Sequence, residues 1–220
     1  MDEFIREVDE EYRRQRINEI WQRYSALIIG IAVLVVAGVG GWRYWQHQEL
    51  QRSEAASTRF ATALQLSRDG KADDAEKALA ALASDAPLGY RLLARFRLAA
   101  EQGKSDAEAG AKAYDALASD TAVDANLRDL ARLRGAILRL DREGGSDAAR
   151  VLEQLASPTN AWRHTAREML GLAALRRGDA DGAGRWFDQI ATDRDTPAGL
   201  RSRLEIYTAL AAGGPVQITQ

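Results

Sequence analysis

The sequence predicts an all-α fold, in which a single apolar helix precedes a stack of about four helical hairpins and one closing helix. The composition leans toward alanine, leucine, arginine and the acidic residues, with four prolines, and this mixture favours helices. Near the N-terminus, the nineteen residues 24–42 carry no formal charge. The segment ALASD occurs at 81–85 and again at 116–120, and self-similarity at such an interval indicates stacked helical pairs.

The bulk composition limits the classes of function. The 220 residues suffice for one moderate domain and an accessory segment. The 30 basic and 32 acidic residues nearly balance, so the charge predicts no general attraction to nucleic acid. The absence of cysteine excludes disulfides, thiolate metal sites and thiol catalysis.

Residues 1–23 place apolar side chains at roughly helical spacing among dense charges of both signs. This pattern predicts an amphipathic lead-in helix on the cytosolic side. A helix lying on the membrane surface and a solvated helix are both open interpretations. The mixed charge favours the solvated one over simple attraction to anionic lipid.

Residues 24–45 are predicted to form a transmembrane helix. The uncharged run would span about 28 Å as a helix, close to the thickness of a hydrocarbon core. Aromatic residues flank it on both sides, as is typical of membrane interfaces: Trp21, Tyr24, Trp42, Tyr44 and Trp45. A buried core helix would carry a polar stripe, and a cleaved signal peptide would lack so long and acidic a leader, so an uncleaved anchor is the preferred interpretation.

Two further features of this segment bear on topology and association. Arginines are denser before the span than after it, which predicts a cytoplasmic N-terminus and a translocated C-terminal domain. Small residues recur at intervals of four, seven and four, which would let another helix approach closely or support a homo-oligomer. These membrane-helix packing candidates are Ala26, Gly30, Ala37 and Gly41.

The repeat itself covers residues 53–212, with the tail 213–220 expected to be flexible. Small residues occupy one column of the alignment, and bulky ones follow four positions later. The spacing resembles that of the tetratricopeptide repeat, in which the small residues mark the crossing of two helices. The predicted hairpins are 53–84, 88–119, 124–156 and 159–192, and 196–212 is the closing helix that terminal repeats need. The small column is Ala75, Gly110, Ala148 and Ala183, and the bulky column is Leu79, Tyr114, Leu152 and Phe187.

Glycine–aspartate clusters recur between the two helices of each predicted hairpin. Gly70, Gly103, Gly145 and Gly178 are expected at the turns, where glycine can adopt a positive φ. The neighbouring residues expected to cap or begin the second helix are Asp73, Asp106, either Ser146 or Asp147, and Asp181. A phosphate loop would need Gly-Lys-Ser/Thr after a strand, and the sequence predicts no strand. A calcium loop would need alternating acids and a terminal glutamate, which none of the four clusters has.

The sequence contains no catalytic constellation, so we expect a protein that is not an enzyme and binds no metal or cofactor. His164 lies near Glu168, but no serine nucleophile with flanking glycines accompanies it. A helical stack instead offers a concave face to another polypeptide. The candidate lining residues are Leu92, Arg95, Leu130, Leu133, Ile137, Leu172 and Leu175, several of which could equally be core between repeats.

Two segments carry a resemblance to a known family. The element GWRYWQHQ at 41–48, and the stretch 170–205 with its Arg-Gly-Asp turn, tryptophan and Thr-Pro, resemble the YfgM family of ancillary SecYEG translocon subunits. The resemblance implies a single-pass protein of the bacterial inner membrane with a periplasmic repeat domain. It also implies the translocon, a PpiD-like periplasmic chaperone and exported client polypeptides as partners. The alternative is an assembly factor or cell-envelope scaffold for another inner-membrane complex.

Overall fold

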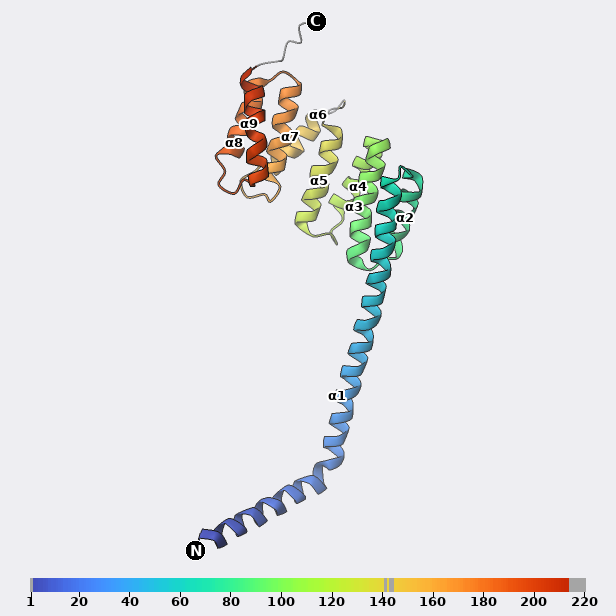
Figure 1. Ribbon diagram of the computed structural model, residues 1–220, viewed down its shortest axis with the longest axis vertical. Coiled ribbons are helices and arrows are strands. Elements are labelled where there is room, and N and C mark those ends of the chain that lie inside the picture. The colour runs from blue at the N-terminus through green and yellow to red at the C-terminus, as the bar shows by residue number, and fades with distance from the viewer. Residues whose placement is uncertain (1, 141, 143–144, 214–220) are drawn as a thin grey trace. The chain divides into compact units, whose positions relative to one another are not determined.

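The computed structural model describes the backbone of residues 2–140, 142 and 145–213. Side chains are described from residue 23 onward within these ranges, except for Ser25, Ile28 and Ala32. Every regular element in the described residues is a helix, which confirms the predicted all-α repeat fold (Figure 1). The helices are α1 (Asp2–Arg68), α2 (Ala72–Asp85), α3 (Leu88–Ser105), α4 (Ala107–Ser119), α5 (Ala125–Arg139), α6 (Gly145–Leu155), α7 (Arg163–Arg176), α8 (Ala180–Ala191) and α9 (Ala198–Gly213).

The chain divides into two units, Met1–Ala55 and Ala56–Gln220. Helix α1 is continuous from Asp2 to Arg68, where the sequence predicted separate helices for 1–23, 24–45 and the start of the repeat. The reason lies in residues 46–55, which contain neither proline nor glycine and therefore give no signal to end a helix.

The first unit exposes its apolar side chains. Large aliphatic residues of the predicted span are more than half exposed, and the aromatic pair Trp42 and Trp45 lies at its end. Within the described residues, no helix meets the length and hydropathy needed to cross a membrane. Ser25, Ile28 and Ala32 of the predicted span, and the side chains of the lead-in helix 1–22, lie outside the described set. The exposed aliphatic residues are Leu27, Ile29, Ile31, Val33, Leu34, Val35, Val36 and Val39.

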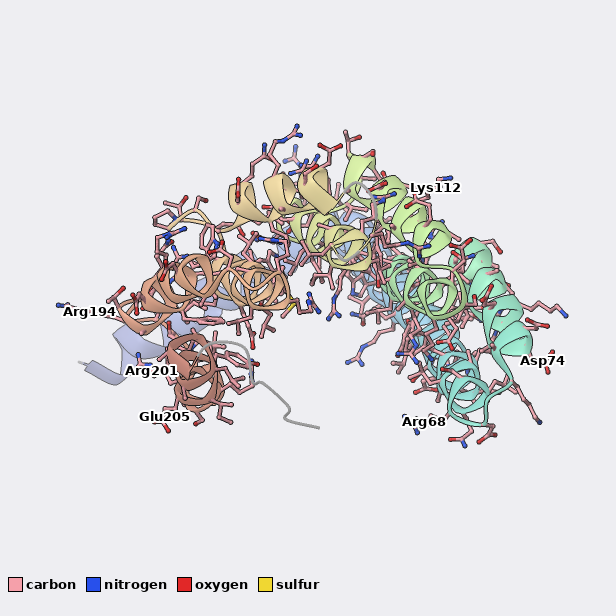
Figure 2. All side chains as sticks on the ribbon, turned by 90° about the horizontal axis from the view of Figure 1, so that it is seen from above. Arg68, Asp74, Lys112, Arg194, Arg201 and Glu205 are labelled. Atoms are coloured by element: carbon pink, nitrogen blue, oxygen red, sulfur yellow. The ribbon has the colours of Figure 1, made fainter. Side chains whose placement is uncertain are left out.

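The second unit is a row of helix pairs. The end of α1 pairs with α2, α3 with α4, α5 with α6 and α7 with α8, and α9 packs on α8. In Figure 2 the second helices α2, α4 and α6 follow the outer side of a curved row, and α3, α5 and α9 follow its inner side. Each pair shares apolar clusters with the next, which is how stacked repeats acquire a core that no single pair could form.

The predicted columns of small and bulky residues are the centre of this core. Ala75 and Ala183 are fully buried, as are Leu79, Leu152 and Phe187 four positions after their own small residue. At Gly171 on α7, an added Cβ would lie 2.4 Å from Cε1 of Phe187, so the phenyl ring requires glycine on the facing helix. The register therefore sets both the burial and the size of the side chains at each crossing.

Two of the four predicted turn glycines lie at turns. Gly70 and Gly178 have φ of 75° and 76°, and each follows the first helix of a pair. The prediction is wrong for Gly103, which lies inside α3, where a Cβ on Gly110 would come within 2.5 Å of its Cα. It is also wrong for Gly145, which begins α6. At Gly103 the requirement is thus close helix packing, which composition cannot distinguish from a turn.

The acids after these glycines behave largely as expected. Asp106 caps α4, where its side chain accepts hydrogen bonds from the N–H groups of Glu108 and Ala109. Acids in the first turns of α2, α6 and α8 interact favourably with the positive helix ends. These first-turn acids are Asp73, Asp147 and Asp181.

Candidate functional site

A column of carboxylates ends the second helices, and each carboxylate binds an arginine from the first helix of its own pair. Arg95 Nη1 lies 2.7 Å from Asp120 Oδ2 in the second pair. The Arg95 guanidinium and the backbone N–H of Ala122 hold the pKa of Asp120 below its ordinary value. The first pair has the corresponding contact between Arg59 and Asp85, at 3.0 Å. These ion pairs connect the two ends of a hairpin.

In the fourth pair the corresponding acid, Asp193, receives several cationic groups. Its Oδ2 atom lies 2.7 Å from Arg163 Nε and 3.2 Å from Arg167 Nη1. The guanidinium of Arg163 and the N–H of Asp195 keep the pKa of Asp193 well below its usual range. His164 Nε2 is 3.1 Å from the same oxygen, but without the alignment of a hydrogen bond. His164 thus packs against a carboxylate already engaged by arginines.

Two buried glutamates connect consecutive first helices. Glu168 on α7 is 6 % exposed and accepts hydrogen bonds from Arg203 Nε and Tyr207 on α9, at 2.9 and 3.1 Å. Glu101 on α3 is 2 % exposed and accepts from Ser67 of α1 at 2.9 Å and from Lys104 at 2.6 Å. Burial opposes ionisation of Glu101, but these hydrogen bonds outweigh it, so its pKa lies below the ordinary value.

The predicted concave-face residues differ in how exposed their side chains are. Leu92, Arg95, Leu130 and Ile137 are partly exposed on α3 and α5, as are Leu172 and Leu175 on α7. Leu133 is 1 % exposed and belongs to the core, because it packs among residues of α6 and α7. Its side chain is therefore not available at the surface. The stripe Ala26, Gly30, Ala37 and Gly41 is exposed in the first unit, and its packing role stays a prediction.

Charge is segregated between the two kinds of helix. In each of α3, α5, α7 and α9 the arginines and lysines outnumber the acids, whereas in each of α2, α4, α6 and α8 the acids outnumber the basic residues. Figure 2 shows Asp74 on the outer side and Arg68 on the inner side of the row. The outer side also carries isolated cations such as Lys112 (Figure 2). The first helices α3, α5, α7 and α9 therefore carry the net positive charge of the repeat, and the second helices carry the net negative charge.

Within the part of the chain that the structure describes, no three His, Asp or Glu side chains lie close enough to hold a metal ion. The exposed apolar and basic side chains of the first helices instead suit contact with another macromolecule.

Comparison with known proteins agrees with this fold. A family profile described as a tetratricopeptide repeat-like domain matches residues 18–206. The chain belongs to this family. Neither a curated protein nor a solved structure matches the chain. Tetratricopeptide repeat-like domains are typically non-catalytic modules of protein interaction, in accord with the surface described above.

Sequence reasoning missed one exposed cation of this tetratricopeptide repeat-like domain. Arg134 lies four residues after Leu130 and three before Ile137, so the three share a face of α5. The spacing of four residues between Leu130 and Arg134 would have been enough to predict from the sequence that they share a helix face. The predicted lining residues included one arginine of α3, Arg95, but only apolar residues of α5.

Proposed function

We propose that this chain is a non-catalytic, membrane-tethered adaptor whose tetratricopeptide repeat-like domain binds other polypeptides. The observation that carries the proposal is the inner side of the helix pairs, where partly exposed leucines alternate with arginines. Helical stacks of this kind present extended surfaces to peptide segments. Among the described residues, no convergent catalytic group requires a different function.

The proposed tether is residues 24–45. Its support is the run of exposed aliphatic side chains, including Leu34 and Val36 at 73 % and 71 % exposed, which would be covered by lipid. Trp42 and Trp45, with ring centroids 5.8 Å apart, would lie at the interface beside Arg43. In this proposal the N-terminus is cytoplasmic and the repeat domain is periplasmic.

The proposed setting is the translocon of the bacterial inner membrane. Its support is the resemblance of GWRYWQHQ and of residues 170–205 to the YfgM family. The partners would be SecYEG, a PpiD-like chaperone and exported polypeptides, with the tether beside the translocon helices. A scaffold for another inner-membrane complex would have the same tether and a different set of partners.

Site-specific photocrosslinking in native membranes tests this function. A photoreactive residue at Leu92 on the inner side should capture exported polypeptides or translocon subunits. The same residue at Ala116, exposed on α4, is the matched control and should capture far less. Equal capture from both positions would argue against binding on the inner side, and capture only of subunits of an unrelated complex would favour the scaffold. Protease added to spheroplasts should reach the repeat domain, and full protection would contradict the periplasmic location.

A further inference from the structure

Helix α6 is the shortest of the helices that the structure describes, and it lies between two clefts. It has 11 residues, whereas the second helices α2, α4 and α8 have 14, 13 and 12. On one side, α4, α5 and α6 border a cleft of ≈ 760 Å³, which Asp147 and Val151 line from α6. On the other side, α6 and the ends of α5 and α7 border a cleft of ≈ 880 Å³, which Ala149 and Glu153 line from α6. Helix α6 therefore packs against its neighbours through one face.

The buried face of α6 is small. Its buried residues are Ala148, Leu152 and Leu155, which pack among residues of α5 and α7. At the position of Leu152, α8 buries the ring of Phe187 and α4 buries the ring of Tyr114. Because the free energy of burial grows with the apolar area removed from water, α6 gains less from packing than α4 or α8 does.

Polar side chains hold α4 to the next pair but do not hold α6. Arg139 of α5 binds Glu108 and Asp115 of α4, at 2.9 and 2.8 Å. In α6, Arg150 and Asp147 form an ion pair within the helix. Among the described residues, no side chain of α6 forms an ion pair or a hydrogen bond with another helix. Apolar packing alone therefore holds the body of α6 in place.

The two ends of α6 differ in their contacts. After α6, Pro158 occupies the position of the acids that end the other pairs. The carbonyl of Ala156 still accepts a hydrogen bond from Arg167 Nε of α7 at 3.0 Å, so the C-terminal end is attached. At the N-terminal end, Ser146 and Asp147 are exposed and line the two clefts. Separation from α5 and α7 therefore requires fewer contacts to break at the N-terminal end.

We propose that α6 opens locally: it detaches from α5 and α7, beginning at its N-terminal end, while the other helix pairs stay folded. A helix of 11 residues is marginal in water on its own, so α6 would lose its helical structure as it detaches. Segments with few buried apolar contacts open at a lower free energy than the whole domain. This inference is independent of the polypeptide binding proposed for the inner side.

Opening would make α6 the point at which the row of helix pairs can bend. Leu133 of α5 and Leu170 of α7 belong to the apolar cluster that α6 shares with both helices. Without α6, direct contacts between these two helices would join the second and fourth pairs, such as the 2.9 Å hydrogen bond from Trp162 Nε1 to the carbonyl of Asn126. A hydrogen bond between helix ends allows the helices to change their angle, whereas a shared packed core fixes it.

Thiol labelling of the full chain in neutral detergent tests the proposal. The chain contains no cysteine, so a single introduced cysteine reports on its own position. Leu155→Cys in α6 and Leu117→Cys in α4 occupy the same column of the repeat, and the two leucines are only 4 % and 1 % exposed. A small thiol reagent reacts only when the cysteine becomes exposed. Leu155→Cys should therefore react at least about tenfold faster than Leu117→Cys.

The dependence on urea separates local from global opening. Low urea concentrations should barely change the labelling rate of Leu155→Cys, because a local opening exposes little surface, whereas the rate of Leu117→Cys should rise steeply. Leu152→Cys and Leu79→Cys form a second matched pair, since both leucines are fully buried in the bulky column, and should differ in the same direction. Urea unfolding followed by circular dichroism gives the global stability with which each rate is compared.

Hydrogen exchange of the unsubstituted chain, followed by mass spectrometry, needs no substitution. Protection factors of α6 peptides should be at least about tenfold lower than those of α4 and α8 peptides. Equal protection of the three helices, or equal labelling within both cysteine pairs, would show that α6 opens only with the whole domain and would overturn the proposal. Faster labelling of Leu117→Cys than of Leu155→Cys would also overturn it. If a cysteine variant does not fold, hydrogen exchange alone decides.

Discussion

The third and fourth helix pairs follow one register but are held together by different means. In the fourth, Phe187 packs over Gly171, Asp193 binds Arg163 and Arg167, and Glu168 connects to α9. In the third pair, Leu152 takes the place of Phe187 and Ala136 takes the place of Gly171. Pro158 replaces the acid, and the Nε atom of Arg128 has no hydrogen-bond acceptor among the described residues. The apolar columns thus recur wherever a pair must pack, while the polar positions vary. Among the described residues, the third pair lacks the ion pair that connects the two ends of the other hairpins.

The largest loss of stability is expected from truncating residues of the bulky column. Phe187→Ala should lower the free energy of unfolding by about 3–5 kcal/mol, because it removes a fully buried ring and leaves a cavity. Leu152→Ala, its counterpart in the third pair, should lower it by about 2–4 kcal/mol. Phe187 also stacks on Tyr207 with ring centroids 5.3 Å apart, so its loss should be the greater. Urea unfolding followed by circular dichroism measures both, and the reverse order would contradict this account of the fourth pair.

The next largest effects are expected at Gly171 and Ala136, which lie on the first helices that pack against the bulky column. Gly171→Ala should destabilise the protein by about 1–3 kcal/mol, since its Cβ would overlap the Phe187 ring. Position 136 already carries alanine, so Ala136→Gly should cost only about 1 kcal/mol of helix propensity. Thermal unfolding of the two variants provides the comparison. A stabilised Gly171→Ala protein would show that the ring can move aside without loss.

The ion pairs of the fourth hairpin should make the free energy of unfolding depend on pH. The pKa of Asp193 is lowered by folding, so its contribution is complete above its ordinary pKa near 3.9 and declines as the pH falls below that value. The wild type should therefore lose more stability between pH 5 and pH 3 than Asp193→Asn does. Asp188→Asn removes an exposed acid of α8 and serves as the control. Identical pH profiles for wild type and Asp193→Asn would show that Asp193 contributes nothing.

The smallest effect is expected from restoring the missing acid. Pro158→Asp should be more stable than Pro158→Asn by about 0.5 kcal/mol, because only the aspartate can pair with Arg128. The asparagine variant carries the same loss of proline rigidity, so the difference isolates the charge. Urea midpoints measure it.

The sequence predicted the packing better than the surface. Columns such as Leu79 and Phe187 follow from spacing alone, because burial is set by helical periodicity and by the repeat. Gly103 was misplaced, because a glycine at a helix crossing looks the same in sequence as a turn glycine. Leu133 is in the core, which was one of its two open interpretations, because a core leucine and a lining leucine also look the same in sequence. The difference in charge between first and second helices can be counted from the sequence only when the helix boundaries are known. That Arg128 lacks the acid which its counterpart Arg163 binds became clear only from the ion pairs of the structure.

Helix α9 bears on how the protein is made. It supplies Leu200 and Leu204 to the apolar cluster that contains Phe187 and Ile190, so the fourth pair cannot bury its outward face until this last helix has been synthesised. A nascent chain halted before residue 198 would leave that cluster open to water and to other chains. A premature stop codon in this region should therefore produce aggregating fragments that are removed by proteolysis, even though three preceding pairs are complete.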